Sequence, residues 1–200
     1  PIINEFFSIH APRYFFLLKL MFIPFDLGIA YILSKFGRND KESKLLSALW
    51  LFNPIVLYVV FMWGTIDVIP TFLTLLAMYL VVKKKNIWGF IFIGLGASYK
   101  MWPLLVLPYI VLLCYKEIKP RIKAFIIGVV PFFLLILPYL RLENFRSFVL
   151  ASDRVSLIGN AGLYIGFLQW LLIYLLAYVL GLFWVNKYSS GDHAKAFDYT

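Results

Sequence analysis

Long apolar runs alternate with short polar stretches along the chain, and this pattern predicts helices that cross a membrane. A spanning helix needs about 20 mostly apolar residues. Lipid favours helices over open strands, because a helix satisfies its own backbone polar groups. Seven segments are candidates, some of them short: 13–34, 45–62, 68–82, 87–99, 102–115, 124–140 and 164–186. We therefore expect an all-α fold, a polytopic transmembrane bundle of about seven membrane segments.

Basic residues occur at every second connection between these segments. Clusters of lysine and arginine follow the first, third, fifth and seventh segments (Lys35 to Lys44, Lys83 to Lys85, Lys116 to Lys123, and Lys187 with Lys195). Loops rich in lysine and arginine stay on the cytoplasmic side of a membrane. One orientation satisfies all four clusters, so we expect the N-terminal stretch, the turn at 63–67, the turn near 100 and the loop 141–163 on the other side.

Composition agrees with a membrane protein. Of the 200 residues, 62% are hydrophobic and only 14% are charged, whereas a soluble domain carries about 25% charged residues. The net charge of +9 is explained by cytoplasmic loops, so nucleic acid is not an expected partner. One cysteine, Cys114, excludes an intrachain disulfide and a multi-cysteine zinc site.

The predicted layout is a single transmembrane domain over residues 1–200. It has a six-segment membrane core (13–140), an extracytoplasmic loop (141–163), a final span (164–186) and a cytoplasmic tail (187–200). Because the chain opens with Pro1 and shows no signal-peptide pattern, we expect a piece of a longer protein. Segments 87–99 and 102–115 are short, so they form either a hairpin that stops inside the membrane boundary or two tilted spans.

Ionisable residues within or beside the apolar segments are the first candidates for function, since they are costly in a membrane. Asp67 follows Trp63 and Gly64 in a turn on the outer face. Its carboxylate either caps the next helix or shapes a site that binds a sugar hydroxyl or a metal ion. Lys19 and Asp26 share one face of the first segment, seven residues apart; they either compensate each other or let Lys19 reach the interface.

Lys100 is the complementary cation. It follows the small residues Gly94, Gly96, Ala97 and Ser98 at the tip of the short pair, where it would contact a lipid phosphate or act as a plain interfacial lysine. In the outer loop, Arg141, Arg146 and Arg154 run against the positive-inside trend. They would bind an anionic headgroup or pair with local carboxylates.

Three short motifs in order resemble a known family. They are Asn53-Pro54, the turn Trp63-Gly64-Thr65-Ile66-Asp67, and the stretch from Gly94 through Lys100-Met101-Trp102-Pro103 to Pro108. Together they resemble the polyprenyl-phosphate-sugar-dependent glycosyltransferases of the GT-C fold, and most closely the integral-membrane mannosyltransferases. The resemblance covers residues 45–108, with Thr65 standing where that family often has glutamine.

The resemblance implies a membrane transferase that moves a hexosyl or mannosyl group on the extracytoplasmic face. Its partners would be a polyprenyl-phosphate sugar donor, a glycan, lipid or protein acceptor, and the bilayer. Asp67 matches the motif carboxylate as a catalytic candidate, and Lys100, with Trp63, Gly64, Arg146 and Arg154, is a candidate for binding substrate or lipid phosphate. The family's catalytic base would precede residue 1. No cofactor is implied with certainty, and a divalent cation stays open.

Two other classes remain open. A transporter would use broken helices and intramembrane charges, and a non-catalytic membrane subunit or scaffold would tolerate replacement of both Asp67 and Lys100. The expected location is a membrane in every case: the plasma membrane in a prokaryote, or the endoplasmic reticulum in a eukaryote.

Overall fold

The computed structural model describes residues 19–62, 65–143 and 167–188. Every regular element in these ranges is a helix. In chain order they are α2 (Ile23–Ser34), α3 (Asp40–Leu51), α4 (Pro54–Leu57), the π-helix η1 (Tyr58–Met62), α5 (Val68–Val82), α6 (Asn86–Tyr99), α7 (Pro103–Cys114), α8 (Ile118–Ile136), the 3₁₀-helix η2 (Tyr139–Arg141) and α11 (Phe167–Tyr188).

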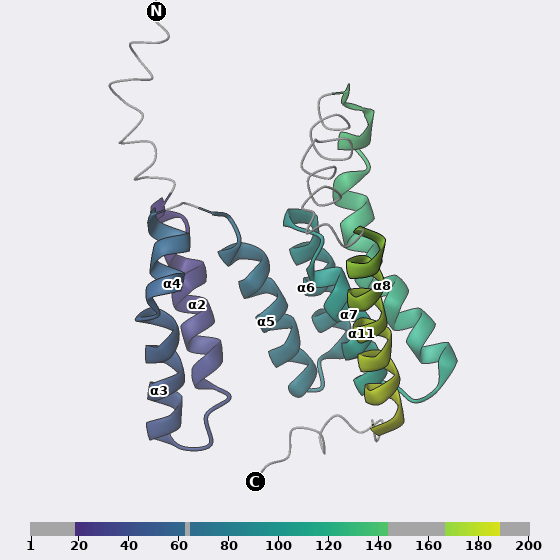
Figure 1. The fold of residues 1–200 in the computed structure, drawn as a ribbon. Coiled ribbons are helices and arrows are strands. Elements are labelled where there is room, and N and C mark those ends of the chain that lie inside the picture. Colours follow the sequence, from purple (N-terminus) through teal and green to yellow (C-terminus); the bar gives the residue numbers. More distant parts are fainter. Residues whose placement is uncertain (1–18, 63–64, 144–166, 189–200) are drawn as a thin grey trace, which may run out of the picture.

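Successive membrane segments run in alternating directions, with α3, α4 and η1 forming one bent segment (Figure 1). Helix α6 lies in the middle and packs against α5 on one side and α8 on the other, while α2 packs against α3 and α5. The loops after α2, α5 and α7 therefore lie at one end of the bundle, together with the end of α11 (Figure 1). We call this the basic end, because Lys35, Lys83 to Lys85 and Lys116 to Lys123 are found there. The opposite end, where α5 begins and α6 ends, is the Asp67 end.

Small residues on α6 let its neighbours approach closely. A Cβ atom added at Gly94 would meet the backbone oxygen of Gly128 in α8, so the two backbones touch at this point. Gly96 faces α5, where an added Cβ would lie 3.3 Å from Leu73 Cβ. Small residues at helix contacts are typical of membrane proteins, in which association depends on close packing and not on expulsion of water.

Two buried clusters hold the helices together. The larger joins α5 to α8, and the smaller joins α2 and η1 to the start of α5. Their fully buried members are Ala77, Val81, Phe90, Ile93, Leu107, Ile110, Val111, Cys114 and Ala124 in the first, and Phe22, Ile29, Val60 and Val68 in the second.

Asp26 has a partner that the sequence analysis did not foresee. Its side chain is 4% exposed, and its Oδ1 accepts a hydrogen bond of 2.7 Å from Nε1 of Trp50 in α3. The second link between these helices is the Ser47 hydroxyl, which donates to the Ala30 carbonyl at 2.8 Å. Asp26 therefore ties α2 to α3, because a buried carboxylate needs a donor.

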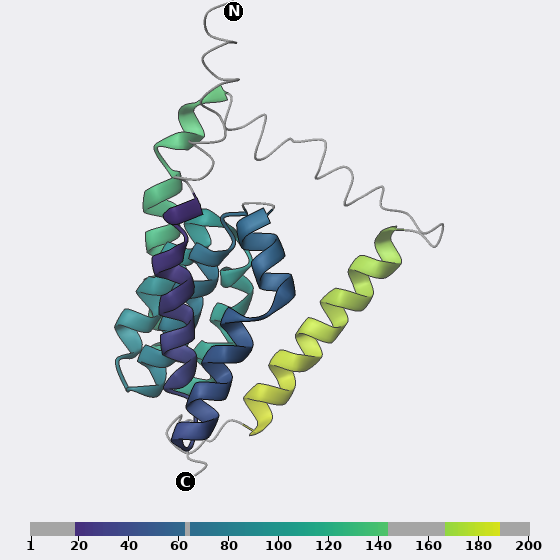
Figure 2. The same cartoon turned by 90° about the vertical axis from the view of Figure 1, so that its left-hand side faces the viewer.

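The C-terminal helix lies at the edge of the bundle and runs obliquely to it (Figure 2). It is held through α7: the Tyr109 hydroxyl donates to the Tyr178 carbonyl, and the Tyr178 hydroxyl donates to the Leu105 carbonyl, both at 2.9 Å. The two rings meet edge to face, with centroids 5.2 Å apart. Two polar groups that would be costly in lipid thus satisfy backbone acceptors across one helix contact.

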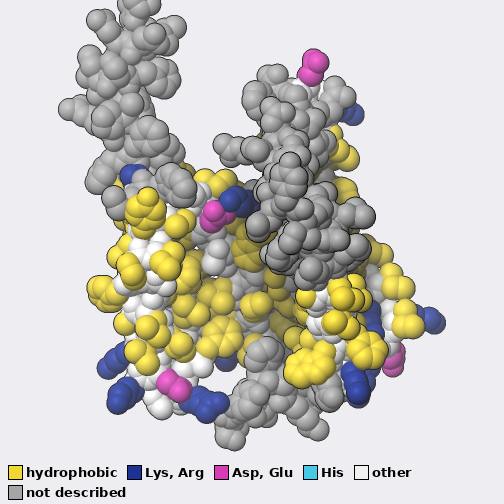
Figure 3. Space-filling view, in the orientation of Figure 1, with side chains coloured by type: hydrophobic (Ala, Val, Ile, Leu, Met, Phe, Trp, Pro, Cys, Tyr) yellow, Lys and Arg dark blue, Asp and Glu magenta, His cyan; other side chains and the backbone are white. Residues whose placement is uncertain are grey.

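Large apolar side chains cover the flanks of the bundle, and lysines and arginines gather at its lower end in the view of Figure 3. Among the most exposed are Phe52 (77%), Ile55 (71%) and Leu134 (66%). By length and composition, one helix in the described ranges, Asp40–Phe61, is able to cross a membrane. Five shorter apolar helices accompany it: Ile23–Ser34, Val68–Val82, Asn86–Tyr99, Pro103–Cys114 and Leu176–Lys187.

Two of the expected segments begin earlier than predicted, whereas the helix of the expected segment 13–34 begins later within the described residues, at Ile23. The expected segment 45–62 begins earlier, at Asp40, and bends at Asn53, where the side-chain oxygen accepts from the Ile55 amide at 2.9 Å and α4 starts with Pro54. The expected segment 124–140 also begins earlier, at Ile118, and ends as a helix at Ile136. The expected segments 68–82, 87–99 and 102–115 agree with α5, α6 and α7 to within one residue.

Candidate functional site

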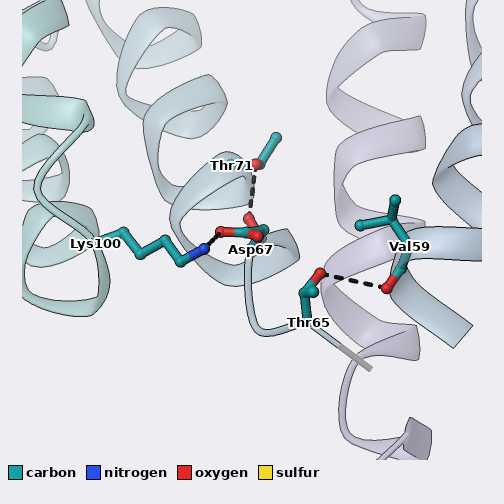
Figure 4. A network of polar contacts seen from close by, with 5 residues as sticks. All are labelled: Val59, Thr65, Asp67, Thr71 and Lys100. Carbon is teal, nitrogen blue, oxygen red and sulfur yellow. Dashed lines mark hydrogen bonds and ion pairs between the residues drawn. The ribbon is translucent and has the colours of Figure 1, made fainter. Parts of the chain in front are cut away.

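The Asp67 end carries an ion pair between two of the residues singled out in the sequence. The Lys100 Nζ atom contacts Asp67 Oδ1 directly, and the two side chains are 45% and 36% exposed (Figure 4). Asp67 comes from the start of α5 and Lys100 from the turn between α6 and α7. The turn at 63–67 and the turn near 100, which the sequence predicted on the same side, are therefore neighbours in the structure.

Lys100 is positioned by the way in which α6 ends and α7 begins. Its backbone is extended (φ −148°, ψ 141°), and its amide donates to the Gly96 carbonyl at 3.3 Å as the last bond of α6. Pro103 then starts α7. The first residue of a helix has no partner for its N–H within the helix, so a proline costs no hydrogen bond there. The extended residue between two helices directs the lysine toward α5.

Asp67 does not cap α5 with its side chain. Its backbone carbonyl instead accepts two bonds from Thr71, one from the hydroxyl at 2.7 Å and one from the amide at 3.1 Å (Figure 4). These bonds fix the first turn of the helix and leave the carboxylate to Lys100. Asp67 stands at the N-cap position of α5 but makes no side-chain capping bond, so of the expected capping role only its position at the positive end of the helix is present.

The turn before Asp67 is anchored to η1. Both the amide and the hydroxyl of Thr65 donate to the Val59 carbonyl at 3.3 Å (Figure 4). A π-helix leaves an extra residue per turn and is often found at functional sites. Thr65, which replaces the glutamine common in the resembling family, thus serves the backbone of the turn.

An apolar pocket of about 660 Å³ lies beside Lys100. One wall is the end of α6 and its turn, and the other is the last part of α8 with η2. The lining residues are Ala97, Ser98, Tyr99, Lys100, Met101, Phe132, Phe133, Leu135, Ile136, Tyr139 and Leu140. The α8 wall was not anticipated, because apolar residues in a membrane helix carry no pattern that marks a pocket. Among the described residues of this lining, Lys100 is the one that is charged.

Four of the candidate residues lie outside the described ranges: Trp63, Gly64, Arg146 and Arg154. Their expected roles stay predictions. Within the described ranges, no three residues of the types His, Cys, Asp and Glu come together as metal ligands. The divalent cation considered for Asp67 stays a prediction as well.

A family model described as "GPI transamidase subunit PIG-U" matches residues 1–197. The chain belongs to the PIG-U family. This match covers both the ion pair and the pocket, so the Asp67 end is part of the family's common region and not an addition to it.

A second match leads back to the mannosyltransferases. The PIG-U family chain is 30% identical over 112 residues to GPI mannosyltransferase 1 of Candida albicans, which corresponds to 53% of this chain and 28% of that protein. The chain thus spans less than a third of the length of this curated relative. No solved structure matches the chain. The resemblance to membrane mannosyltransferases is supported in this coarse form, as a likeness to one of them over about half of the chain.

Proposed function

We propose that this chain is a membrane-embedded part of a GPI transamidase subunit, and that its Asp67 end binds the GPI glycolipid. The observation that carries the proposal is the charged pair Lys100–Asp67 beside an apolar pocket of about 660 Å³. The family description names a GPI transamidase subunit. It therefore supports GPI as the glycolipid and the transamidase as the complex to which the chain belongs.

The chemistry of the site suits a glycolipid that contains a phosphate. Lysine binds phosphate as a point charge, and a carboxylate accepts hydrogen bonds from sugar hydroxyls. An acyl chain would occupy the apolar pocket between α6 and α8. Because lipid tails gain little by leaving one apolar environment for another, the pocket would select by shape, and the charged pair would supply most of the preference for the headgroup.

The surface supports a location in a membrane. Large apolar side chains such as Phe52 and Leu134 are exposed on the flanks, and a soluble monomer rarely exposes apolar patches of more than a few hundred Å². We propose a multi-pass protein of the endoplasmic reticulum membrane, with the Asp67 end on the luminal side and the basic end in the cytoplasm.

A glycosyltransferase is the second candidate, and the identity to GPI mannosyltransferase 1 favours it. A polyprenyl-phosphate sugar donor would place its phosphate at Lys100 and its prenyl chain in the same pocket. The transferase would also need a base for the acceptor hydroxyl. The resemblance implies that this base precedes residue 1, and Asp67 is engaged in the ion pair. The binding role needs no such base, so we prefer it.

The experiment that separates the two functions identifies the glycolipid that builds up when the site is damaged. Cells that depend on the full-length protein would carry Lys100→Ala, and their glycolipids would be labelled with radioactive mannose. If attachment of GPI to proteins is blocked, complete GPI remains unused. If mannosyl transfer is blocked, GPI precursors that lack a mannose remain. We expect complete GPI to accumulate and the amount of a GPI-anchored reporter at the cell surface to fall. Accumulation of a mannose-deficient precursor would favour the transferase.

A matched pair of variants tests the pocket. Ile136→Trp would fill the pocket from the α8 wall, while Leu134→Trp, on the same helix but outside the pocket lining and 66% exposed, is the control. We expect the same accumulation in Ile136→Trp and none in Leu134→Trp. Equal behaviour of the two tryptophan variants at equal protein levels would contradict a role for the pocket.

A further inference from the structure

A second apolar groove, of about 390 Å³, lies on the other half of the bundle, between α7, α8 and α11. Its apolar lining consists of Pro108, Val111, Leu112, Ile122, Phe125, Ile126 and Leu182. Within the part of the chain that the structure describes, the one charged residue in the lining is Arg121, in the first turn of α8. Because α8 starts at the basic end (Figure 1), Arg121 lies where the groove approaches that end.

The α8 wall of the groove faces outward. Ile122 is 55% exposed, Phe125 44% and Ile126 54%, so this wall would face lipid in a membrane. Arg121 is fixed at its end of the groove: its Nε donates to the Tyr115 carbonyl at 2.7 Å. A guanidinium group has five N–H donors in a rigid fork, and this bond uses one of them. The others are suited to phosphate oxygens.

The surroundings of Arg121 are positive. The loop and first turn from 116 to 123 contain Lys116, Lys119, Arg121 and Lys123 against the single carboxylate of Glu117. Glu117 precedes α8 but its side chain makes no capping hydrogen bond to the helix. The N-terminal amides of α8 therefore add to the positive potential at this point.

We propose that this groove binds an anionic phospholipid of the leaflet at the basic end, with one acyl chain along the groove and the phosphate at Arg121. Charge complementarity selects an anionic lipid over a neutral one, because basic pockets between membrane helices attract anionic headgroups. We commit to a lipid and not to a transmembrane helix, because the groove approaches the positive end of α8 at Arg121, where a lipid headgroup and one acyl chain meet charge and apolar surface together. The site lies at the end of the bundle opposite to Lys100 and does not depend on the proposed function.

The test measures lipid binding to the purified full-length protein by native mass spectrometry. The probes are phosphatidylserine and phosphatidylcholine with identical palmitoyl and oleoyl chains. We expect the wild type to prefer phosphatidylserine, and Arg121→Gln to weaken phosphatidylserine binding about fivefold to tenfold while leaving phosphatidylcholine unchanged. Lys41→Gln removes an exposed lysine from the first turn of α3 at the same end and serves as the control. Equal losses in the two glutamine variants would overturn the proposal.

Two further variants keep the test decisive. Arg121→Lys loses the fork geometry but keeps the charge, so it should retain a preference for phosphatidylserine even if the bond to Tyr115 is needed for full stability. Ile126→Trp fills the groove and should weaken both lipids, whereas Val130→Trp, one turn further along α8 and outside the groove lining, should weaken neither. Unchanged lipid binding by Ile126→Trp would show that the groove has another occupant. So would a spectrum in which this variant loses a bound protein subunit and keeps its lipid.

Discussion

At the scale of single residues, Lys100 and Asp67 form an ion pair, so replacing one of them leaves the charge of the other unpaired. Lys100→Ala removes the cation and leaves the Asp67 carboxylate unpaired beside the pocket. In the proposed function that carboxylate repels the lipid phosphate, in addition to the loss of a charge-assisted contact worth about 1.5–3 kcal/mol. We expect attachment of a GPI-anchored reporter to fall at least tenfold, which quantitative flow cytometry would measure.

The double variant separates binding from mere pairing. Asp67→Ala in the Lys100→Ala background should restore part of the lost attachment, because it removes the repulsion. An exposed ion pair contributes about 0–1 kcal/mol to stability, so thermal unfolding should change little in all three proteins. If Asp67→Ala alone is as damaging as Lys100→Ala and the double variant shows no recovery, the lysine serves only to hold the aspartate.

Lys84 is a second residue whose backbone determines the effect of a substitution. Its φ is +60°, and its amide and that of Lys85 bond back to Val81 and Leu80 at 2.9 and 2.8 Å at the end of α5. A residue with a Cβ atom is destabilised by about 1–2 kcal/mol in this conformation. Glycine adopts it without a steric cost. Lys84→Gly should therefore raise the free energy of unfolding by about 0.5–1 kcal/mol.

The adjacent lysine provides the control for Lys84→Gly. Lys83 has a φ of −79°, so glycine gains nothing there and costs backbone entropy. Thermal unfolding of the purified full-length protein should rise for Lys84→Gly and stay or fall for Lys83→Gly. A lower melting temperature for Lys84→Gly would mean that the lysine side chain, and not the backbone, matters at this turn.

The sequence predicted part of this residue-scale picture. Lys100 and Asp67 lie at two turns on the same side of alternating helices, so their approach followed from the topology. The role of Asp26 was missed because its partner, Trp50, lies 24 residues away on another helix. Periodicity shows which residues share a helix face, but it does not show which helices become neighbours.

At the scale of elements, α6 is the central helix of the larger buried cluster, where it packs against α5 on one side and α8 on the other. Gly94→Ala should destabilise the bundle strongly, because its Cβ would meet the backbone oxygen of Gly128 and lie 3.1 Å from the Pro131 ring. Backbone atoms cannot move aside as a flexible side chain does. Overpacking costs about 1–3 kcal/mol, occasionally more, so we expect the melting temperature to fall by several degrees.

Gly96→Ala is the matched control for Gly94→Ala. It lies on the same helix two residues further on, and its Cβ would be 3.3 Å from Leu73 Cβ and 3.5 Å from the Pro70 oxygen. This is tight but nearly ordinary contact, and alanine also gains about 1 kcal/mol of helix propensity. We expect a small change in melting temperature. Equal losses for the two alanine variants would show that α6 and α8 are further apart than the structure has them.

Helix ends were harder to predict than helix centres. Helix α8 begins at Ile118 and not near 124, because Lys119, Arg121 and Lys123 occupy its first turns and look like a loop in a hydrophobic pattern. The π-helix η1 left no signal either, since one extra residue in a turn does not alter an apolar run. Asn53 and Pro54 were noted as a motif, but not as the bend between α3 and α4.

At the scale of the whole molecule, alternation of charge along the chain becomes separation of charge in space. The basic loops, distant in sequence, lie together at one end, and Asp67 and Lys100 lie at the other (Figure 1). From α2 to α8, the direction of each membrane segment follows from short loops that join antiparallel neighbours, which is why the sequence was sufficient to predict it. The pocket and the groove depend on which side chains line each gap, and no sequence pattern predicted them.

The orientation in the membrane is the last prediction. Single cysteines at Lys41, Lys84, Lys119 and Leu142 would be placed in full-length protein that lacks other cysteines, Cys114 included. Sealed microsomes expose the cytoplasmic face, so a membrane-impermeant maleimide should label positions 41, 84 and 119. Position 142, which follows η2 at the Asp67 end and is 54% exposed, should be labelled only after the membrane is permeabilised.

Each mixed result has a defined meaning for the fold. Protection at 84 with labelling at 142 would invert the bundle and place the Asp67 end in the cytoplasm, which would remove the glycolipid site from the luminal face. Labelling at 41 with protection at 84 would mean that the chain between them crosses an odd number of times, contrary to the two crossings made by the antiparallel elements from α3 to η1 and α5. Agreement at all four positions would fit a hairpin of α6 and α7 that stops inside the membrane, because positions 84 and 119 lie on the same side in that case too. It would equally fit crossings by the short helices α5, α6 and α7, although each is shorter than the roughly 20 residues that usually span a bilayer. Such short helices require a thinned bilayer or flanking lysines that reach the interface, and Lys83 to Lys85 and Lys116 lie where this would be needed.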